Sequence, residues 1–229
     1  LKRRPLFINK DYLQSNYTPL DIPHRGDQIE SLARILAPAL RTEKPSNVFL
    51  YGKTGTGKTC VSMYVLNQIE TACKKNNLKL KTYYLNCKLK KVADTEYRVI
   101  AQITRGFGRD VPATGLPTDE IYKIFIETID QEKQLLILVL DEIDQLINKI
   151  GDGILYNLTR LNSELKKCQL TIIGISNDLM FTDNLDPRVR SSLSEEEIVF
   201  PPYNAIELQD ILKQRSNLTF RKEVISEGV

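Results

Sequence analysis

A glycine-rich segment at residues 52–59 carries the residue types that bind phosphate groups. It reads GKTGTGKT and matches the pattern G-x-x-x-x-G-K-[ST] at every fixed position. Its glycines let backbone N–H groups approach phosphate oxygens, its second lysine adds a positive charge, and the following hydroxyl is a ligand for Mg²⁺. We therefore predict a site for ATP or ADP with Mg²⁺, formed by Gly52, Lys53, Thr54, Gly55, Thr56, Gly57, Lys58, Thr59 and Cys60.

An acidic pair, Asp141-Glu142, directly follows the apolar run at residues 135–140. Such a run is typical of a central parallel strand that is covered on both faces. Together with the phosphate-binding loop, the pair indicates ATP hydrolysis. Asp141 can hold the Mg²⁺ shell with Thr59, and Glu142 can act as the general base for the attacking water. A small-molecule kinase has no use for this second carboxylate. We expect Asp144 to cap the helix that follows.

Two further groups of polar residues follow later strands. Asn177 comes after the apolar run at residues 170–175, where its amide can orient the water or contact the γ-phosphate. A turn-forming Asn-Asp pair would give the same residues. Arg188 and Arg190 lie in the segment LDPRVRSSL, and either can serve as an arginine finger that reaches a neighbouring subunit's nucleotide. A basic surface turn is the alternative.

The elements that must position these residues follow from hydrophobic periodicity. Strands are expected at 47–51, 81–86, 135–140, 170–175 and 197–200, and helices at 27–41, 58–75, 95–106, 118–131, 152–167 and 205–215. Asp27 and Glu30 resemble a capping box for the first helix. Alternating strands and helices predict an α/β fold with a parallel sheet, which places ligands at the carboxyl ends of the strands. Pro201-Pro202 is the expected hinge to a further element.

Composition excludes several other classes of protein. The chain has 229 residues, of which 41% are hydrophobic and 27% charged, and no apolar run is long enough to span a bilayer. Its four cysteines form no C-x-x-C pair, and it has one histidine, His24, so no familiar zinc site or disulfide framework can be written. No nucleophile motif accompanies His24, which argues against a serine or cysteine hydrolase.

Positive charge is concentrated in one stretch of the chain. Residues 74–109 contain ten Lys or Arg and only two acidic residues, although the net charge of the whole chain is +3. This asymmetry is typical of a surface that attracts nucleic acid. A solvated, lysine-rich surface would give the same count. The two interpretations differ in whether the charges gather in space.

Taken together, these motifs resemble one family, the archaeal origin-recognition and Cdc-type replication initiators of the AAA+ ATPases. The resemblance is carried by PHRG at 23–26, GKTGTGKT at 52–59, LDEID at 140–144, Asn177-Asp178, LDPRVRSSL at 185–193 and FPPY at 200–203. It implies a five-stranded parallel sheet in the order 5-1-4-3-2, lying between helices, with a small helical lid.

The resemblance also implies roles for individual residues. The segment Tyr17–Arg25, including Pro23, His24 and Arg25, would wall the adenine, and Tyr203 and Arg215 would close over the nucleotide from the lid. Asn177 matches the sensor 1 position, and Arg188 or Arg190 matches the finger. The segment at about 89–111 matches an initiator-specific insertion that touches duplex DNA, with phosphate contacts expected from Arg98, Arg105 and Arg109.

The expected organisation has three parts: an arm at 1–26, a base domain at 27–200 and the start of a lid at 201–229. On this resemblance the family's C-terminal winged helix is absent, and the chain ends inside the lid. The implied protein is cytoplasmic and nucleoid-associated, with no membrane segment. It hydrolyses ATP slowly, as a switch.

The implied partners are double-stranded origin DNA, other initiator subunits and the replicative helicase. The alternative is a signalling or transposition ATPase that acts on a protein partner. In that case, replacing Arg98, Arg105 and Arg109 would leave DNA affinity unchanged. A third possibility is a DNA-binding module in which ATP is only structural and is never turned over.

Overall fold

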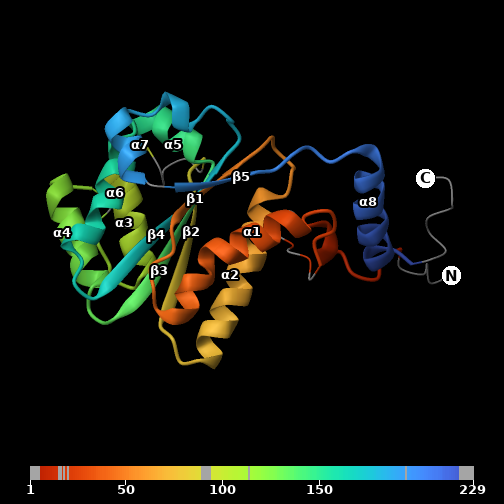
Figure 1. Ribbon diagram of the computed structural model, residues 1–229, viewed down its shortest axis with the longest axis horizontal. Coiled ribbons are helices and arrows are strands. Elements are labelled where there is room, and N and C mark those ends of the chain that lie inside the picture. Colours follow the sequence, from red (N-terminus) through yellow and green to blue (C-terminus); the bar gives the residue numbers. More distant parts are fainter. Residues whose placement is uncertain are drawn as a thin grey trace.

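The computed structural model describes residues 6–221, except 15, 16, 18, 20, 89–93, 113 and 194 (Figure 1). The first residues of the expected insertion (89–93) and the end of the expected lid (222–229) thus lie outside the described residues. The helices are α1 (Gly26–Leu36), α2 (Lys58–Lys75), α3 (Glu96–Gly106), α4 (Thr118–Ile129), α5 (Ile143–Ile150), α6 (Gly153–Glu164), α7 (Pro187–Leu193) and α8 (Ala205–Thr219). The strands are β1 (Asn47–Tyr51), β2 (Leu80–Asn86), β3 (Gln134–Asp141), β4 (Cys168–Ser176) and β5 (Glu195–Val199). Short 3₁₀ turns lie at Asp11–Leu13, Ala37–Arg41 and Thr182–Asn184.

The five strands form one parallel sheet in the order β2-β3-β4-β1-β5, which confirms the order 5-1-4-3-2. Its register places the functional segments at one edge. Asp141 at the end of β3 is aligned with Asn86 on β2 and with Ile175 on β4. Tyr51, the last residue of β1 before the glycine-rich loop, is aligned with Ser176. The carboxyl ends of four strands therefore meet along a single line.

The sheet lies between two layers of helices, and its central strands β1, β3 and β4 are buried on both faces. All eight residues of β3 are buried, and its six apolar residues alternate between two hydrophobic clusters. One cluster contains Leu136, Leu138 and Leu140 and packs against α3 to α7. The other contains Leu135, Ile137 and Val139 and packs against α1 and α2 (Figure 1). Burying each Leu, Ile or Val side chain contributes about 1.5–3 kcal/mol, so this strand anchors the edge that carries Asp141.

The first helix differs from its predicted form. It is α-helical only to Leu36 and continues as a 3₁₀ turn over Ala37–Arg41. Pro38 explains the change, because proline has no N–H to donate to the turn before it. The capping box of Asp27 and Glu30 was also wrong. The helix begins after Arg25 without a side-chain cap, because a guanidinium has only donors and cannot accept from the first N–H groups of the helix.

The last helix, α8, stands away from the sheet and lies beside the N-terminal segment (Figure 1). Asn204 and Glu207 form a capping box at its start, and the helix continues four residues beyond the predicted end, to Thr219. Phe7 and Phe220 form an antiparallel bridge, and their rings lie 5.1 Å apart. Among the described helices, none is both long enough and apolar enough for a membrane crossing.

Replacing Gly174 in β4 tests the packing of the central strands. Gly174 is paired with Phe49 of β1, and a Cβ at this position would lie 2.2 Å from the buried Phe49 ring. We expect Gly174→Ala to lower the free energy of unfolding by about 1–3 kcal/mol in urea titrations, because the core has no room for it. The control is Gly153→Ala at the start of α6, where a Cβ meets nothing within 4 Å. Equal stability of the two variants would contradict the close packing of Gly174 against Phe49.

Candidate nucleotide-binding site

The glycine-rich loop connects β1 to α2 through backbone conformations that favour glycine. Gly52, Gly55 and Gly57 have φ angles of 152°, 83° and 94°. A Cβ on Gly52 would lie 2.4 Å from the carbonyl oxygen of Phe200, and one on Gly57 would lie 2.8 Å from the Tyr203 hydroxyl. The loop is thus fixed by its own dihedral angles and by the segment after β5. Helix α2 begins directly after it, so its N-terminal N–H groups face the same space.

A cleft of about 600 Å³ lies at the carboxyl edge of the sheet, beside this loop. It is lined by Tyr17, Thr54, Gly55, Thr56, Gly57, Lys58, Thr59, Cys60, Met63, Tyr84, Asn86, Asp141, Glu142, Asn177 and Arg215. The structure thus brings together residues predicted from four separate motifs, including the lid residue Arg215. Met63, Tyr84 and Asn86 were missed. Asn86 ends a predicted strand, so the rule for parallel sheets could have found it.

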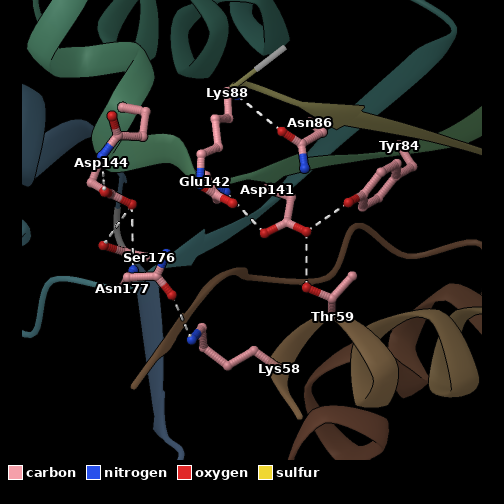
Figure 2. A network of polar contacts seen from close by, with 11 residues as sticks. Lys58, Thr59, Tyr84, Asn86, Lys88, Asp141, Glu142, Asp144, Ser176 and Asn177 are labelled. Carbon is pink, nitrogen blue, oxygen red and sulfur yellow. Dashed lines mark hydrogen bonds and ion pairs between the residues drawn. The ribbon is translucent and has the colours of Figure 1, made fainter. Parts of the chain in front are cut away.

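Lys58 is buried in this cleft and joins its polar network through Asn177 (Figure 2). Its Nζ donates to Asn177 Oδ1 at 3.0 Å, to the Lys53 carbonyl at 2.9 Å and to the Gly52 carbonyl at 2.5 Å. Burial lowers the pKa of Lys58, and the nearby carboxylates, chiefly Asp141, oppose this shift. Asn177 therefore lies against the phosphate-binding lysine, which is the place where an amide can contact a γ-phosphate.

Asp141 is held by three hydrogen bonds (Figure 2). Its Oδ2 accepts from the Thr59 hydroxyl at 2.8 Å and from the Tyr84 hydroxyl at 2.6 Å, and its Oδ1 accepts from the Glu142 N–H at 2.9 Å. Burial and the Asp141 carboxylate raise the pKa of Tyr84 well above its usual range, so the phenol keeps its proton. A carboxylate oxygen beside a hydroxyl oxygen is a donor set that suits Mg²⁺. Thr59 and Asp141 thus fit the ion that the motif implies.

Glu142 has a left-handed backbone conformation, with φ 54° and ψ 47°, directly before α5. This backbone conformation is uncommon for residues other than glycine, asparagine or aspartate, and it typically costs about 1–2 kcal/mol. It lets the carboxylate line the cleft while Asp141 ends the strand. The Lys88 ammonium lies 3.4 Å from the Glu142 carboxylate. Sequence reasoning missed this pairing.

Asp144 does not cap a helix, so that prediction was wrong. Its Oδ1 accepts hydrogen bonds from the Ser176 hydroxyl and from the Asn177 N–H, both at 3.3 Å (Figure 2). The buried carboxylate faces the end of β4 because α5 packs against that strand. Asp144 therefore holds the backbone that presents Asn177 to Lys58.

Arg25 does not line the cleft, contrary to the expected adenine wall. The residue is 2% exposed and lies behind the phosphate-binding loop. Its Nε donates to the Thr56 carbonyl at 2.8 Å and one terminal nitrogen donates to the Pro201 carbonyl at 2.6 Å. The guanidinium also lies 3.8 Å from the centre of the Tyr203 ring. Arg25 therefore joins the loop to the segment that leads into α8.

Pro23, His24 and Tyr203 also lie outside the lining of the cleft. His24 Nε2 lies 3.3 Å from a carboxylate oxygen of Asp210 on α8, so this segment contacts the lid helix from the side. The segment 17–25 was expected to wall the adenine. Among its described residues, Tyr17 alone lines the cleft.

The comparisons with known proteins agree with this geometry. Residues 41–179, more than half of the chain, match the AAA domain family. The chain belongs to the AAA domain family. Its sequence is also 52% identical to an ORC1-type DNA replication protein of Pyrococcus furiosus and 50% identical to one of Methanosarcina mazei, over the full length of this chain. The chain spans 54–55% of the length of these relatives.

Two solved structures share the fold. The Aeropyrum pernix ORC1 protein in complex with DNA is 41% identical, with a TM-score of 0.89, and the match covers 97% of this chain and 56% of that one. The Aeropyrum pernix ORC2 protein, in ADPNP-ADP complexes, is 26% identical with a TM-score of 0.81, over 97% and 59% of the two chains. The resemblance to archaeal initiators is thereby confirmed.

In this AAA domain, the two candidate finger residues lie on α7, outside the cleft of their own chain. Arg190 is paired with Asp183 at 3.0 Å, whereas the Arg188 side chain is 85% exposed and lies 3.4 Å from Asp186. A finger that acts on a neighbouring subunit must project from the surface. Arg188 is the more exposed of the two candidates.

Outside residues 89–93, which the structure does not describe, the basic stretch at 74–109 does not form one surface. Lys79 and Lys81 lie at the start of β2 and Lys88 follows its end, so about 20 Å of strand separates them. Arg98 and Arg109 form exposed ion pairs with Asp94 at 3.4 Å and Glu127 at 2.9 Å. The Arg105 guanidinium instead donates twice to the Val111 carbonyl, at 3.0 and 2.8 Å. Arg105 therefore holds the loop after α3, which leaves Arg98 and Arg109 as the surface candidates.

Replacing Arg25 by lysine tests its structural role in the AAA domain. Lysine keeps the charge but lacks the fork that reaches both the Thr56 and Pro201 carbonyls. We expect Arg25→Lys to lower the free energy of unfolding by about 1–3 kcal/mol, since a buried carbonyl loses its donor. Urea titration measures this. Arg34→Lys, at an exposed position of α1, is the control and should change stability by less than about 0.5 kcal/mol.

Proposed function

We propose that this chain is the ATP-binding and ATP-hydrolysing part of a DNA replication initiator. The observation that carries the proposal is the convergence of Lys58, Thr59, Asp141, Glu142 and Asn177 on one cleft. The names of the similar proteins support the replication role, and the ADPNP-ADP complexes of the Aeropyrum pernix ORC2 protein support a nucleotide in this cleft.

Binding of ATP follows from the charges and donors along the loop. Backbone N–H groups of residues 54–59 and the Lys58 ammonium would take the phosphates, and Tyr17 and Arg215 would enclose the opposite end of the nucleotide. Thr59 and Asp141 would hold Mg²⁺, which neutralises charge on the phosphates when it is bound.

Hydrolysis depends on Glu142, which directly follows Asp141 at the end of β3, and on Asn177, which follows the neighbouring strand β4. Glu142 would accept a proton from water, and Asn177, fixed by Asp144, would orient the γ-phosphate or the water. The Glu142 carboxylate is paired with Lys88, so turnover requires that it face water instead. This requirement supports slow, switch-like hydrolysis. Arg188 or Arg190 from a neighbouring subunit would offset the negative charge that develops on the γ-phosphate during hydrolysis.

The proposed macromolecular partners are double-stranded origin DNA, other initiator subunits and the replicative helicase. We assign the DNA contact on this domain to the segment around α3, through Arg98 and Arg109, with Arg105 holding the loop between them. A signalling or transposition ATPase that acts on a protein partner is the alternative. In that case these arginines contact no phosphate.

Replacing Glu142 by glutamine tests the catalytic assignment. We expect Glu142→Gln to bind ATP as the wild type does but to release phosphate at least about 100-fold more slowly, because a carboxamide does not accept the proton. Glu164→Gln, at an exposed position of α6, is the control and should keep wild-type turnover. Unchanged turnover in Glu142→Gln would contradict its role as the base. A wild type without any turnover would favour a structural nucleotide.

The DNA assignment is tested by salt-dependent binding of a labelled duplex. We expect the double variant Arg98→Ala, Arg109→Ala to bind more weakly and to reduce the slope of log affinity against log salt by about 1 per lost phosphate contact. The matched control is Lys79→Ala, Lys81→Ala, which removes two charges at the start of β2. Equal binding by the two double variants would favour a protein partner.

A further inference from the structure

Tyr84 has a contact in the cleft that the hydrolysis residues do not explain. It lies on β2, the edge strand, and its hydroxyl donates to Asp141 Oδ2 at 2.6 Å (Figure 2). The same oxygen accepts from the Thr59 hydroxyl, and the other carboxylate oxygen accepts from the Glu142 N–H. Every donor to Asp141 in this set is uncharged. The orientation of the carboxylate is therefore fixed by hydrogen bonds from neutral donors.

The three donors are not equivalent once Thr59 serves as a ligand. The Glu142 N–H belongs to the residue next to Asp141 and holds Oδ1 at the strand end. Thr59 lies on α2 and would share its oxygen with a cation. Tyr84 approaches from the neighbouring strand, with its backbone aligned with Val139 of β3. The Tyr84 hydroxyl therefore restrains rotation of the Asp141 carboxylate. Unlike Thr59 it is not a proposed ligand of the cation, and unlike Glu142 it is not next to Asp141 in the sequence.

Packing alone does not account for the position of this side chain. Tyr84 is 37% exposed and lines the cleft, so its ring contributes little to the core. Tyr83, the preceding residue, points to the opposite face of β2. There it packs against Phe107 and donates to the Gln102 carbonyl at 3.1 Å. The two tyrosines thus separate a core-packing role from a role in the cleft.

We propose that Tyr84 is a positioning residue for the magnesium site, acting through Asp141. Its hydroxyl holds Oδ2 beside the Thr59 hydroxyl, so that Asp141 and Thr59 would both be placed to hold a bound Mg²⁺. Outer partners of this kind commonly change metal affinity by about 10–100-fold when they are removed. The proposal deepens the proposed function and rests on it, because it assigns a further determinant of Mg²⁺ binding in the same cleft.

The test compares nucleotide affinity with and without magnesium. The affinity of a fluorescent, non-hydrolysable ATP analogue is measured in EDTA and in saturating Mg²⁺, and the ratio of the two dissociation constants gives the magnesium-dependent gain. We expect Tyr84→Phe to keep the affinity in EDTA within about twofold of the wild type and to lose about 10-fold of the gain. Tyr83→Phe, which loses a hydroxyl on the other face of the same strand, should retain the full gain.

The outcomes separate failure of the Tyr84 role from failure of the proposed function. A full gain in the wild type and an equal or larger gain in Tyr84→Phe would overturn the role of Tyr84 alone. No gain in the wild type would overturn the magnesium site itself, and the Tyr84 role with it. Weaker binding by Tyr84→Phe in EDTA as well would show that the tyrosine contacts the nucleotide or supports the fold.

A double-mutant cycle keeps the test decisive even where Tyr84→Phe changes stability. Asp141→Asn should lose most of the gain, and adding Tyr84→Phe to it should have no further effect, because Tyr84 acts through this carboxylate. Additive losses in the double variant would overturn the proposal. Thermal unfolding of all four proteins in EDTA checks that each one is folded.

Discussion

The in-register parallel pairing of β1, β4, β3 and β2 is the constraint on which the rest of the structure depends. It places Tyr51, Ser176, Asp141 and Asn86 side by side at one edge, although these residues are far apart in the sequence. The six apolar side chains of β3 pack into two buried clusters, so a slip of its register would exchange the side chains between the clusters and disrupt the close packing of both. The positions of the acidic pair and of the phosphate-binding loop relative to each other are therefore set by core packing rather than by the cleft residues themselves.

Burial of charged groups is the second condition that shapes the cleft. Lys58, Asp141 and Asp144 are each nearly inaccessible to water, and each has hydrogen-bond partners from another element. A buried polar group that lost its partner would cost about 1–3 kcal/mol, so the network holds its members in a narrow range of geometries. The same contacts that satisfy these groups also present Asn177, Thr59 and Asp141 to the place where phosphate and Mg²⁺ are proposed to bind. The same buried hydrogen bonds thus stabilise the fold and hold the cleft residues in place for binding.

The contacts that join α8 to the rest of the chain differ from the buried packing of the sheet. Among the described residues they include the Arg25 fork, the pair of His24 and Asp210, the bridge between Phe7 and Phe220, and the packing of α8 beside the turn at Asp11–Leu13. Helix α8 itself exposes large apolar side chains, among them Ile206 and Leu212. Such sparse contacts belong to the less stable end of a structure, where parts can move with ligand binding. Arg25 is the link between the two parts, because one guanidinium holds both the phosphate-binding loop and the segment before α8.

From the sequence by itself, family resemblance determined the sheet order, and periodicity placed the five strands and all the α-helices except α5 and α7. Its motifs predicted which residues take the phosphate, the magnesium ion and the catalytic roles. These features are local, since a loop of glycines or an apolar strand with two carboxylates carries its chemistry within a few residues. Only the tertiary structure decided the contacts between distant segments: Tyr84 with Asp141, Lys88 with Glu142, and Arg25 with Pro201. It also corrected Asp144 from a helix cap to a support for Asn177, and it divided the basic stretch between two ends of β2. The physical reason is that side-chain partners across the sheet depend on register and packing, which no local pattern encodes.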